Sequence, residues 1–156
     1  MLGILAVTAA PKFLNIQRDA RISSLNGVKG ALESSFSMFA MKSQLPSANI
    51  ISVTDDIRIL LLNDRDGIRI SNFDNYPFFS YFNMGNELAG IDAINQLANI
   101  NVYSIDYDGS AKNKLNIEFY TNKYGDFRIF PPLDNYDEDN SKTKCYLQYY
   151  INKSHL

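Results

Sequence analysis

The stretch that decides the fold runs from Leu2 to Ser43 and reads LGILAVTAAPKFLNIQRDARISSLNGVKGALESSFSMFAMKS. Its pattern predicts one long helix, interrupted once by Pro11 and ended before Pro46. At a rise of about 1.5 Å per residue, this helix would span roughly 60 Å. A chain of 156 residues folds into a domain only about 35–40 Å across. The helix therefore outruns its domain, and one half of it must protrude.

The protruding half is apolar. From Leu2 to Ala10 it carries no charge, and Thr8 is its one polar side chain. The run is too short to cross a bilayer, which takes about 20 apolar residues, and no basic region precedes it as in a secretory signal. We interpret it as the end of a longer apolar helix whose start is missing, with Met1 an introduced or misassigned start. An ordinary buried N-terminal helix turn is the alternative.

Pro11 marks the weakest part of the predicted helix. A proline has no backbone N–H, so the carbonyl of Val7 loses its hydrogen-bond partner. Gly3 and Pro11, both weak helix formers, bracket the apolar run. The sequence therefore predicts a kink near Pro11, or local melting between Gly3 and Pro11.

Two opposite faces follow along the helix from Ile22 onward. Large apolar residues recur every three or four positions and form a stripe that we expect to pack on the head domain: Leu25, Val28, Leu32, Phe36 and Phe39. Small residues recur with the same spacing on the other face: Ser23, Gly27, Gly30, Ser34 and Ser37. Faces of this kind let a second backbone approach closely, so we expect a packing partner there. A weak surface without a partner is the alternative.

Composition argues against several classes of function. The net charge is −2, from 15 basic and 17 acidic residues, and no basic block points to nucleic acid. Cys145 is the only cysteine, so an intrachain disulfide is impossible, and His155 is the only histidine. These two residues leave little material for a metal centre or a nucleophile–base pair. We therefore expect neither an enzyme nor a cofactor.

The rest of the chain alternates between strand-like runs and polar turns. Pro46–Thr54 reads as a connection, and Asn63–Gly67 as a hairpin turn that ends in Asp-Gly. Asp64 and Asp66 also resemble a fragment of a calcium loop, but the other ligands are absent at the expected spacing. A short helix is predicted over Asn86–Ala98. Strands are predicted over Ile57–Leu62, Gly67–Ser71, Asn101–Asp106, Leu115–Tyr120, Phe127–Phe130 and Cys145–Ile151.

These elements predict an α+β fold. The long N-terminal helix, kinked near Pro11, would pack on an antiparallel sheet of about four or more strands. Residues 1–21 would form the protruding apolar half of that helix, and residues 22–156 the globular head domain. Aromatic residues concentrate in Tyr76–Phe82 and Tyr146–Tyr150, either as core rings or as an adhesive surface for a carbohydrate.

One set of residues near the start of the chain carries a family resemblance: Gly3-Ile4-Leu5-Ala6-Val7, Ala9-Ala10-Pro11-Lys12-Phe13-Leu14, Gln17 and Asp19-Ala20-Arg21. They resemble the N-terminal helix of type IV pilins, most closely the mannose-sensitive haemagglutinin (MSHA) class. The match covers Leu2–Ala31. The remainder resembles the family in layout alone, with a long helix, an antiparallel sheet and a short helix after a Tyr-Pro pair.

The resemblance implies a structural subunit that polymerises with its own copies into a thin surface fibre for adhesion, motility or biofilm formation. Before assembly the apolar helix would anchor the subunit in the bacterial inner membrane, where the pilus assembly machinery takes it up. In the extracellular fibre the helices would bundle at the centre, and the heads would coat the outside. The assembly residues that the resemblance implies are Leu2, Gly3, Ile4, Leu5, Val7, Pro11, Phe13 and Leu14.

Two departures from the family pattern stand out. The processing site and the first mature residues, with a glutamate used in assembly, are missing; we interpret this as N-terminal truncation, and the membrane anchor depends on restoring that segment. A second cysteine, which would close the C-terminal loop, is also missing. Calcium could hold that loop instead, although no EF-hand spacing is present and a solvated loop without metal is the preferred interpretation. Its ligands would be Asp134, Asp137, Glu138 and Asp139.

Two other functions stay open. One keeps the fold and changes the system, as a type II secretion pseudopilin or a minor pilin at the fibre tip. The other is a soluble adhesive or carbohydrate-binding module, which the aromatic segments motivate.

Overall fold

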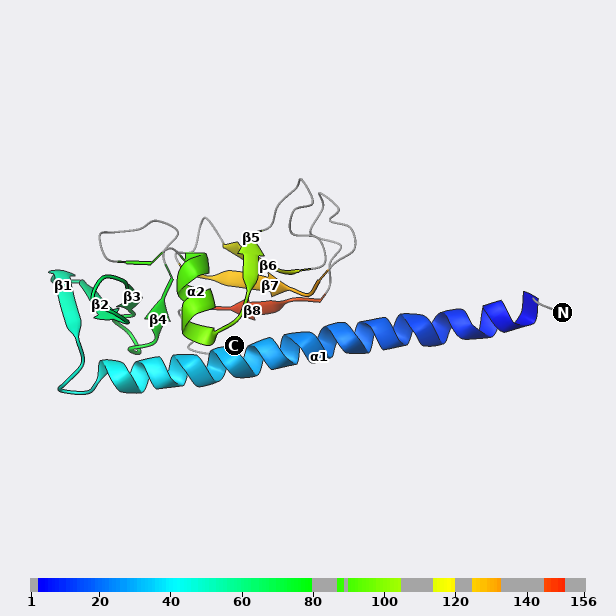
Figure 1. Ribbon diagram of the computed structural model, residues 1–156, viewed down its shortest axis with the longest axis horizontal. Helices are drawn as coiled ribbons and strands as arrows, with labels where there is room; N and C mark the ends of the chain where they lie inside the picture. The colour runs from blue at the N-terminus through cyan, green and yellow to red at the C-terminus, as the bar shows by residue number, and fades with distance from the viewer. Residues whose placement is uncertain are drawn as a thin grey trace.

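A computed structural model describes residues 3–79, 87–88, 90–104, 114–119, 125–132 and 145–150, with side chains from Ile16 onward. One long helix, α1 (Gly3–Ser43), runs along a head that contains two sheets and a short helix, α2 (Gly90–Ala98) (Figure 1). The strands are β1 (Ile50–Thr54), β2 (Ile57–Leu61), β3 (Gly67–Ile70), β4 (Pro77–Phe78), β5 (Val102–Ser104), β6 (Leu115–Phe119), β7 (Phe127–Phe130) and β8 (Leu147–Tyr149). The α+β class is therefore confirmed.

Helix α1 is continuous from Gly3 to Ser43 and passes through Pro11. The predicted melting between Gly3 and Pro11 is absent, and Figure 1 shows a gently curved ribbon rather than a sharp kink. A proline removes one hydrogen bond and crowds one carbonyl, whereas the bonds of the adjacent turns remain. The helix can therefore bend slightly and continue.

The described strands form two sheets of four strands each, where the sequence predicted a single antiparallel sheet. The first sheet has the order β1-β2-β3-β4 and is antiparallel throughout. In the second, of order β5-β6-β7-β8, β5 lies parallel to β6 and the other neighbours are antiparallel. Alternating side chains determine which face a strand buries, but not the direction of its neighbour. The pattern could therefore indicate the strands without their pairing.

Two strands lie where the sequence predicted none. β1 occupies most of the predicted connection Pro46–Thr54, because the β-branched run IISVT follows directly on the turn residues that obscured it. β4 has only two residues, and its register places Pro77 opposite Ile70 and Phe78 opposite Arg69. So short a strand has no sequence pattern of its own, and its pairing depends on β3.

The other predicted elements differ from the structure mainly at their ends. The predictions for β2, β3, β6 and β7 agree to within one residue, whereas β5 and β8 begin one and two residues later than predicted. The predicted strand ends at Asp106, Tyr120 and Ile151 lie outside the described residues. Helix α2 begins at Gly90 rather than Asn86, because residues 87–88 extend along β3. Glu87 forms a parallel bridge to Gly67, and the Leu88 N–H donates to the Gly67 carbonyl at 2.9 Å.

The predicted turn Asn63–Gly67 joins β2 to β3. Asn63 Oδ1 accepts hydrogen bonds from the N–H groups of Arg65 and Asp66 at 2.8 and 2.7 Å, which is how asparagine commonly stabilises a turn. A Cβ at Gly67 would lie 2.7 Å from the Leu60 carbonyl oxygen. Glycine at this position therefore lets the two strands approach.

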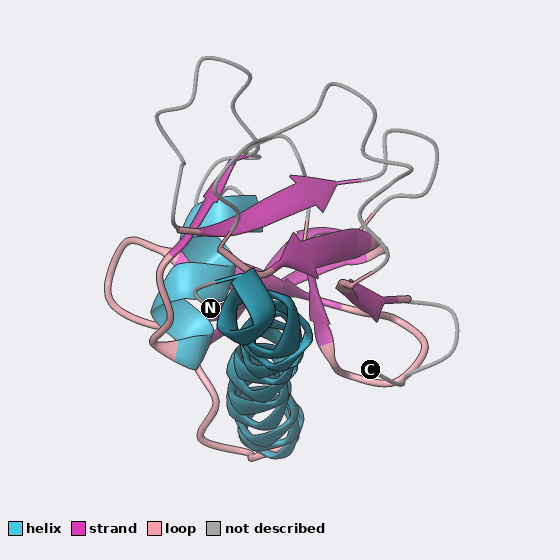
Figure 2. Cartoon of the chain, turned by 90° about the vertical axis from the view of Figure 1, so that its right-hand side faces the viewer, coloured by secondary structure: helices cyan, strands magenta, loops and turns pink. Residues whose placement is uncertain are grey.

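The core lies between α1 and the sheets. Helix α1 contributes the whole predicted apolar stripe, and none of its side chains is more than 7% exposed: Leu25, Val28, Leu32, Phe36 and Phe39. Figure 2 looks along α1 and shows the sheets and α2 gathered on one side of it. The helix is thus both a wall of the head and the rod that extends from it.

An aromatic cluster packs α1 against the residue that follows β4 and against the second sheet. The Phe36 ring lies 5.4 Å from that of Phe79, which follows β4, and 5.3 Å from that of Tyr149 in β8, measured between centroids. Phe79 and Tyr149 also contact Phe127 in β7, at 5.7 and 5.0 Å. Ring pairs at such distances add about 0.5–1.5 kcal/mol to the stabilisation from burial. Phe36 is therefore a central side chain of the fold.

Candidate assembly surface on the long helix

The N-terminal half of α1 extends beyond the head, and no other described element lies beside it in Figure 1. The side chains from Ile16 to Ala20 are all exposed, with Ile16 at 63%, whereas burial against the head begins at Leu25. Leu2 and the side chains of Gly3–Leu14 lie outside the described residues. The predicted assembly residues Gly3, Ile4, Leu5, Val7, Pro11, Phe13 and Leu14 are thus placed only by the helical backbone of α1.

The small-residue face, defined as Ser23, Gly27, Gly30, Ser34 and Ser37, is exposed along its whole length. A Cβ added at Gly27 or Gly30 would meet nothing within 4 Å. The fold of a single chain therefore gives no steric reason for these two glycines, each of which costs about 1 kcal/mol relative to alanine within a helix. A second molecule packed against this face would supply such a reason.

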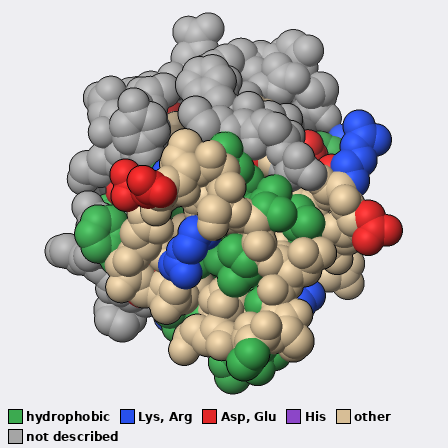
Figure 3. Space-filling view, turned by 90° about the vertical axis from the view of Figure 1, so that its left-hand side faces the viewer, with side chains coloured by type: hydrophobic (Ala, Val, Ile, Leu, Met, Phe, Trp, Pro, Cys, Tyr) green, Lys and Arg blue, Asp and Glu red, His purple; other side chains and the backbone are tan. Residues whose placement is uncertain are grey.

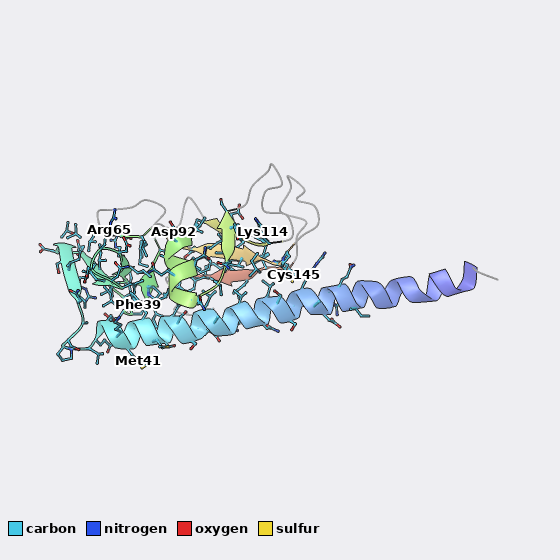
Figure 4. All side chains as sticks on the ribbon, in the orientation of Figure 1. Phe39, Met41, Arg65, Asp92, Lys114 and Cys145 are labelled. Atoms are coloured by element: carbon cyan, nitrogen blue, oxygen red, sulfur yellow. The ribbon has the colours of Figure 1, made fainter. Side chains whose placement is uncertain are left out.

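Large apolar side chains continue the same side of α1 towards its C-terminal end. Met38 is 64% exposed and Met41 62%, and Leu45 just beyond the helix is 55% exposed. Met41 follows Ser34 and Ser37 by seven and four residues, so it lies in line with them. In Figure 4, Met41 points away from the head and Phe39 towards it. The sequence interpretation missed these methionines, although their spacing from Ser34 was the signal for them.

Charged side chains flank this surface. Lys29 and Glu33 form an exposed pair at 3.6 Å, one helical turn apart, and Arg18 and Asp19 form another at 3.8 Å. Exposed pairs of this kind contribute less than about 1 kcal/mol to stability. These pairs keep the exposed surface of α1 polar, and they form no contact between α1 and the head.

The aromatic segments divide between core and surface. Phe79 and Tyr149 are buried, Tyr76 and Phe78 are half-buried, and Tyr146 and Tyr150 are 40% and 37% exposed. The Arg128 guanidinium covers one face of Tyr146 at 4.6 Å from the ring centroid. Most of the described rings in these segments therefore serve packing, and residues 80–82 are not part of the described chain.

Glu87 is a buried acid beside β3. Its side chain is 3% exposed, and neither carboxylate oxygen has a hydrogen-bond partner among the described residues. Burial raises the pKa of Glu87 above its ordinary value of 4.5, and attraction to the Arg69 guanidinium offsets part of that increase. The folded protein therefore holds this proton to a higher pH than the unfolded chain does.

We expect stability to fall as the pH rises through the interval between the ordinary and the raised pKa of Glu87. Below the interval the carboxyl group is protonated in both states, and above it the folded state bears the full cost of a buried charge. Glu87→Gln, which stays uncharged, should remove this part of the pH dependence and be more stable than the wild type at neutral pH. Urea unfolding at about pH 4 and about pH 8 measures the difference.

The control for Glu87 is Glu33→Gln, which changes an exposed acid on α1. This control should keep the pH dependence of the wild type. If Glu87→Gln kept it too, burial of Glu87 would not be its cause.

In the described parts of the chain, no group of three or more His, Cys, Asp or Glu residues is placed to hold a metal ion. The acidic loop with Asp134, Asp137, Glu138 and Asp139 lies outside those parts. Cys145 is a free, half-buried thiol.

Comparison of the chain with protein-family models, with curated proteins and with solved structures found no match. Among the helices that the structure describes, none has the length and apolarity that a membrane span requires. The physical character of α1 is therefore the main basis for a functional proposal.

Proposed function

We propose that the protein is the structural subunit of a type IV pilus-like surface fibre and that it polymerises through α1. The observation that carries this proposal is the division of one helix into two environments. The C-terminal half of α1 lies in the core of the head, whereas the N-terminal half extends beyond it with exposed side chains from Ile16 to Ala20. The resemblance of Gly3–Arg21 to the N-terminal helix of MSHA-class pilins supports the same function.

The small-residue face gives this assembly a physical basis. Helices whose facing residues are small approach closely, so their backbones gain more dispersion contact than helices with bulky facing residues. Contacts between different parts of identical chains build an open filament when the rotation from one copy to the next does not close a ring. In this filament the copies of α1 bundle at the centre and the heads face outwards. The subunit would enter it from the bacterial inner membrane with the help of an assembly machinery.

The test is to follow the full chain in a bacterium that produces it. Fibres sheared from the cell surface should contain the protein as a major component, seen by immunogold electron microscopy and by quantitative mass spectrometry. Normal expression without any protein in the sheared fibres would contradict the proposal. A ratio of one copy to very many of another subunit would instead indicate a minor tip pilin, and fibres seen only with a secretion system would indicate a pseudopilin.

A further inference from the structure

We propose that the exposed edge of β1 pairs with the same edge of a second copy of this chain, as two antiparallel strands related by a two-fold axis. This contact uses the first sheet and not α1. It therefore goes beyond the proposed polymerisation and can be tested apart from it.

β1 is an edge strand that lacks two of the usual protections, charged side chains and proline. It is the first strand of its sheet, and among the described residues it pairs with β2 alone. Four of its five residues, IISVT, are β-branched, and the strand contains no charge and no proline. Natural sheets usually blunt an edge with lysine, with proline or by covering it. Here Ser52, Val53 and Thr54 are all exposed, with Val53 at 51%.

The hydrogen-bond pattern shows which backbone groups of β1 face outwards. The Leu61 N–H donates to the Asn49 carbonyl at 2.9 Å, between residues that lie directly opposite each other by the register Ile50↔Leu60 and Ile51↔Ile59. Because hydrogen-bonded and non-bonded pairs alternate in an antiparallel ladder, Ile51 bonds towards β2. Both backbone groups of Ser52 and the Ile50 carbonyl therefore point away from the sheet. The Ile50 N–H is already bonded to the Ala48 carbonyl at 3.0 Å.

This arrangement fits its own copy. With a two-fold axis at Ser52, the N–H of each Ser52 donates to the carbonyl of the other, so the outward backbone groups of both Ser52 residues are satisfied. The same axis places Ile51 opposite Val53 of the second copy, a β-branched pair of the kind that stabilises sheets. The register irregularity between Ser52 and Thr54 limits the flat part of the strand. The contact between the two copies is therefore short, because the irregularity ends the regular pairing.

The charged residues next to β1 are compatible with this pairing register. Asp55 and Asp56 form the turn after the strand, beyond the residues that pair, so no like charges face each other across the new pair. A partner of other chemistry would have to supply a matching strand, whereas a second copy provides one with the correct length and polarity. This self-complementarity is why we assign the edge to a copy of the chain.

The position of β1 gives the contact a role in a fibre. β1 lies at the end of the molecule opposite the N-terminus of α1 (Figure 1), and Figure 3 looks directly at that end, where hydrophobic side chains are exposed among charged ones. In a filament with copies of α1 at its centre, this end belongs to the head. Edge pairing there would join neighbouring filaments side by side, so the predicted outcome is bundling of fibres.

The first test is cross-linking of the full chain with its native thiol removed, as Ser52→Cys in a Cys145→Ser background. Opposed residues of a hydrogen-bonded pair have Cα atoms about 5.5 Å apart, which lies within the range of a disulfide. Mild oxidation should therefore give a covalent dimer on a non-reducing gel. The matched control is Ser47→Cys in the same background, which places a thiol on an exposed residue before β1 and should give little dimer.

The second test exchanges charge across the two-fold axis. Ser52→Lys and Ser52→Asp each place like charges face to face, so each variant alone should bundle or dimerise at least roughly tenfold more weakly than the wild type. An equal mixture of the two should recover the association. Arg58 lies opposite Ser52 on β2, so melting curves must show that both variants are folded.

Each result either supports or overturns the proposed edge pair. Dimer from Ser52→Cys above the control, together with recovery in the charge mixture, supports the edge pair. The proposal is overturned if, on assembled fibres where the subunits are concentrated, Ser52→Cys gives no more dimer than Ser47→Cys. It is also overturned if the charge mixture associates no better than either variant alone. Single fibres that form normally from Ser52→Lys would show that the loss concerns edge pairing and not polymerisation through α1.

Discussion

Phe36→Ala is expected to lower the free energy of unfolding by about 3–5 kcal/mol. Phe36 is 2% exposed and contacts the rings of Phe79 and Tyr149 within 5.4 Å. Its removal leaves a cavity where α1 meets elements from both parts of the head, and neighbouring rings held by other contacts cannot fill it. Because many domains have a total stability of only about 5–15 kcal/mol, the variant should be close to unfolding at physiological temperature.

The matched control for Phe36 is Met38→Ala, two residues further along the same helix. Met38 is 64% exposed, so its truncation should change stability by no more than about 0.5 kcal/mol. Urea unfolding followed by circular dichroism measures both variants. Equal losses in the two would mean that α1 is not packed on the head through its predicted stripe.

Replacing Gly27 and Gly30 together with glutamine is expected to move stability and assembly in opposite directions. Glutamine is a good helix former and glycine a poor one, so the isolated subunit should gain about 1 kcal/mol. Open space around both positions leaves room for the new side chains within one chain. In a bundle of close-packed helices the same side chains would separate the backbones, and fibres should disappear.

Ser24→Gln is the control for this pair, since Ser24 is exposed on α1 but does not belong to the small-residue face. It should leave both stability and fibre yield near those of the wild type. Thermal unfolding of the purified chain and counts of surface fibres provide the two measurements. Normal fibres from the glutamine pair would show that the small-residue face faces solvent in the assembled state as well.

The opposite signs distinguish an assembly surface from an ordinary helix surface. A substitution that merely damages the subunit lowers stability and fibre yield together. A glycine that is needed for contact with a partner shows opposite effects, because its replacement raises the stability of the subunit and lowers the yield of fibres. Such trade-offs between stability and function are common where a site serves a second molecule.

The sequence predicted the parts of this fold that have a strong period, and not the parts set by contacts distant in the chain. The stripe from Leu25 to Phe39 repeats every three or four residues, and each member is buried. β4 is held by its register with β3 rather than by its own two residues. Helix α2 starts at Gly90, later than predicted, because Glu87 and Leu88 pair with Gly67. No local sequence pattern indicates this contact.

The candidate surface shows the same division. Its small residues were visible in the sequence because they repeat with the helix, whereas their exposure required the position of the head. Met38 and Met41 were overlooked because methionine is also common in protein cores. The parallel pairing of β5 with β6 was beyond reach for a different reason, because strand direction depends on the path between strands and not on their side chains.

The use of one unbroken helix for both core and extension has a mechanical consequence. A pull on the N-terminal end of α1 runs along the helix axis and reaches the side chains of Leu25 to Phe39 with no hinge in between. Those side chains interlock with the sheets across the direction of the load, so they resist together in shear and do not peel apart one after another. Tension on the rod would thus be carried by the whole interior of the head at once.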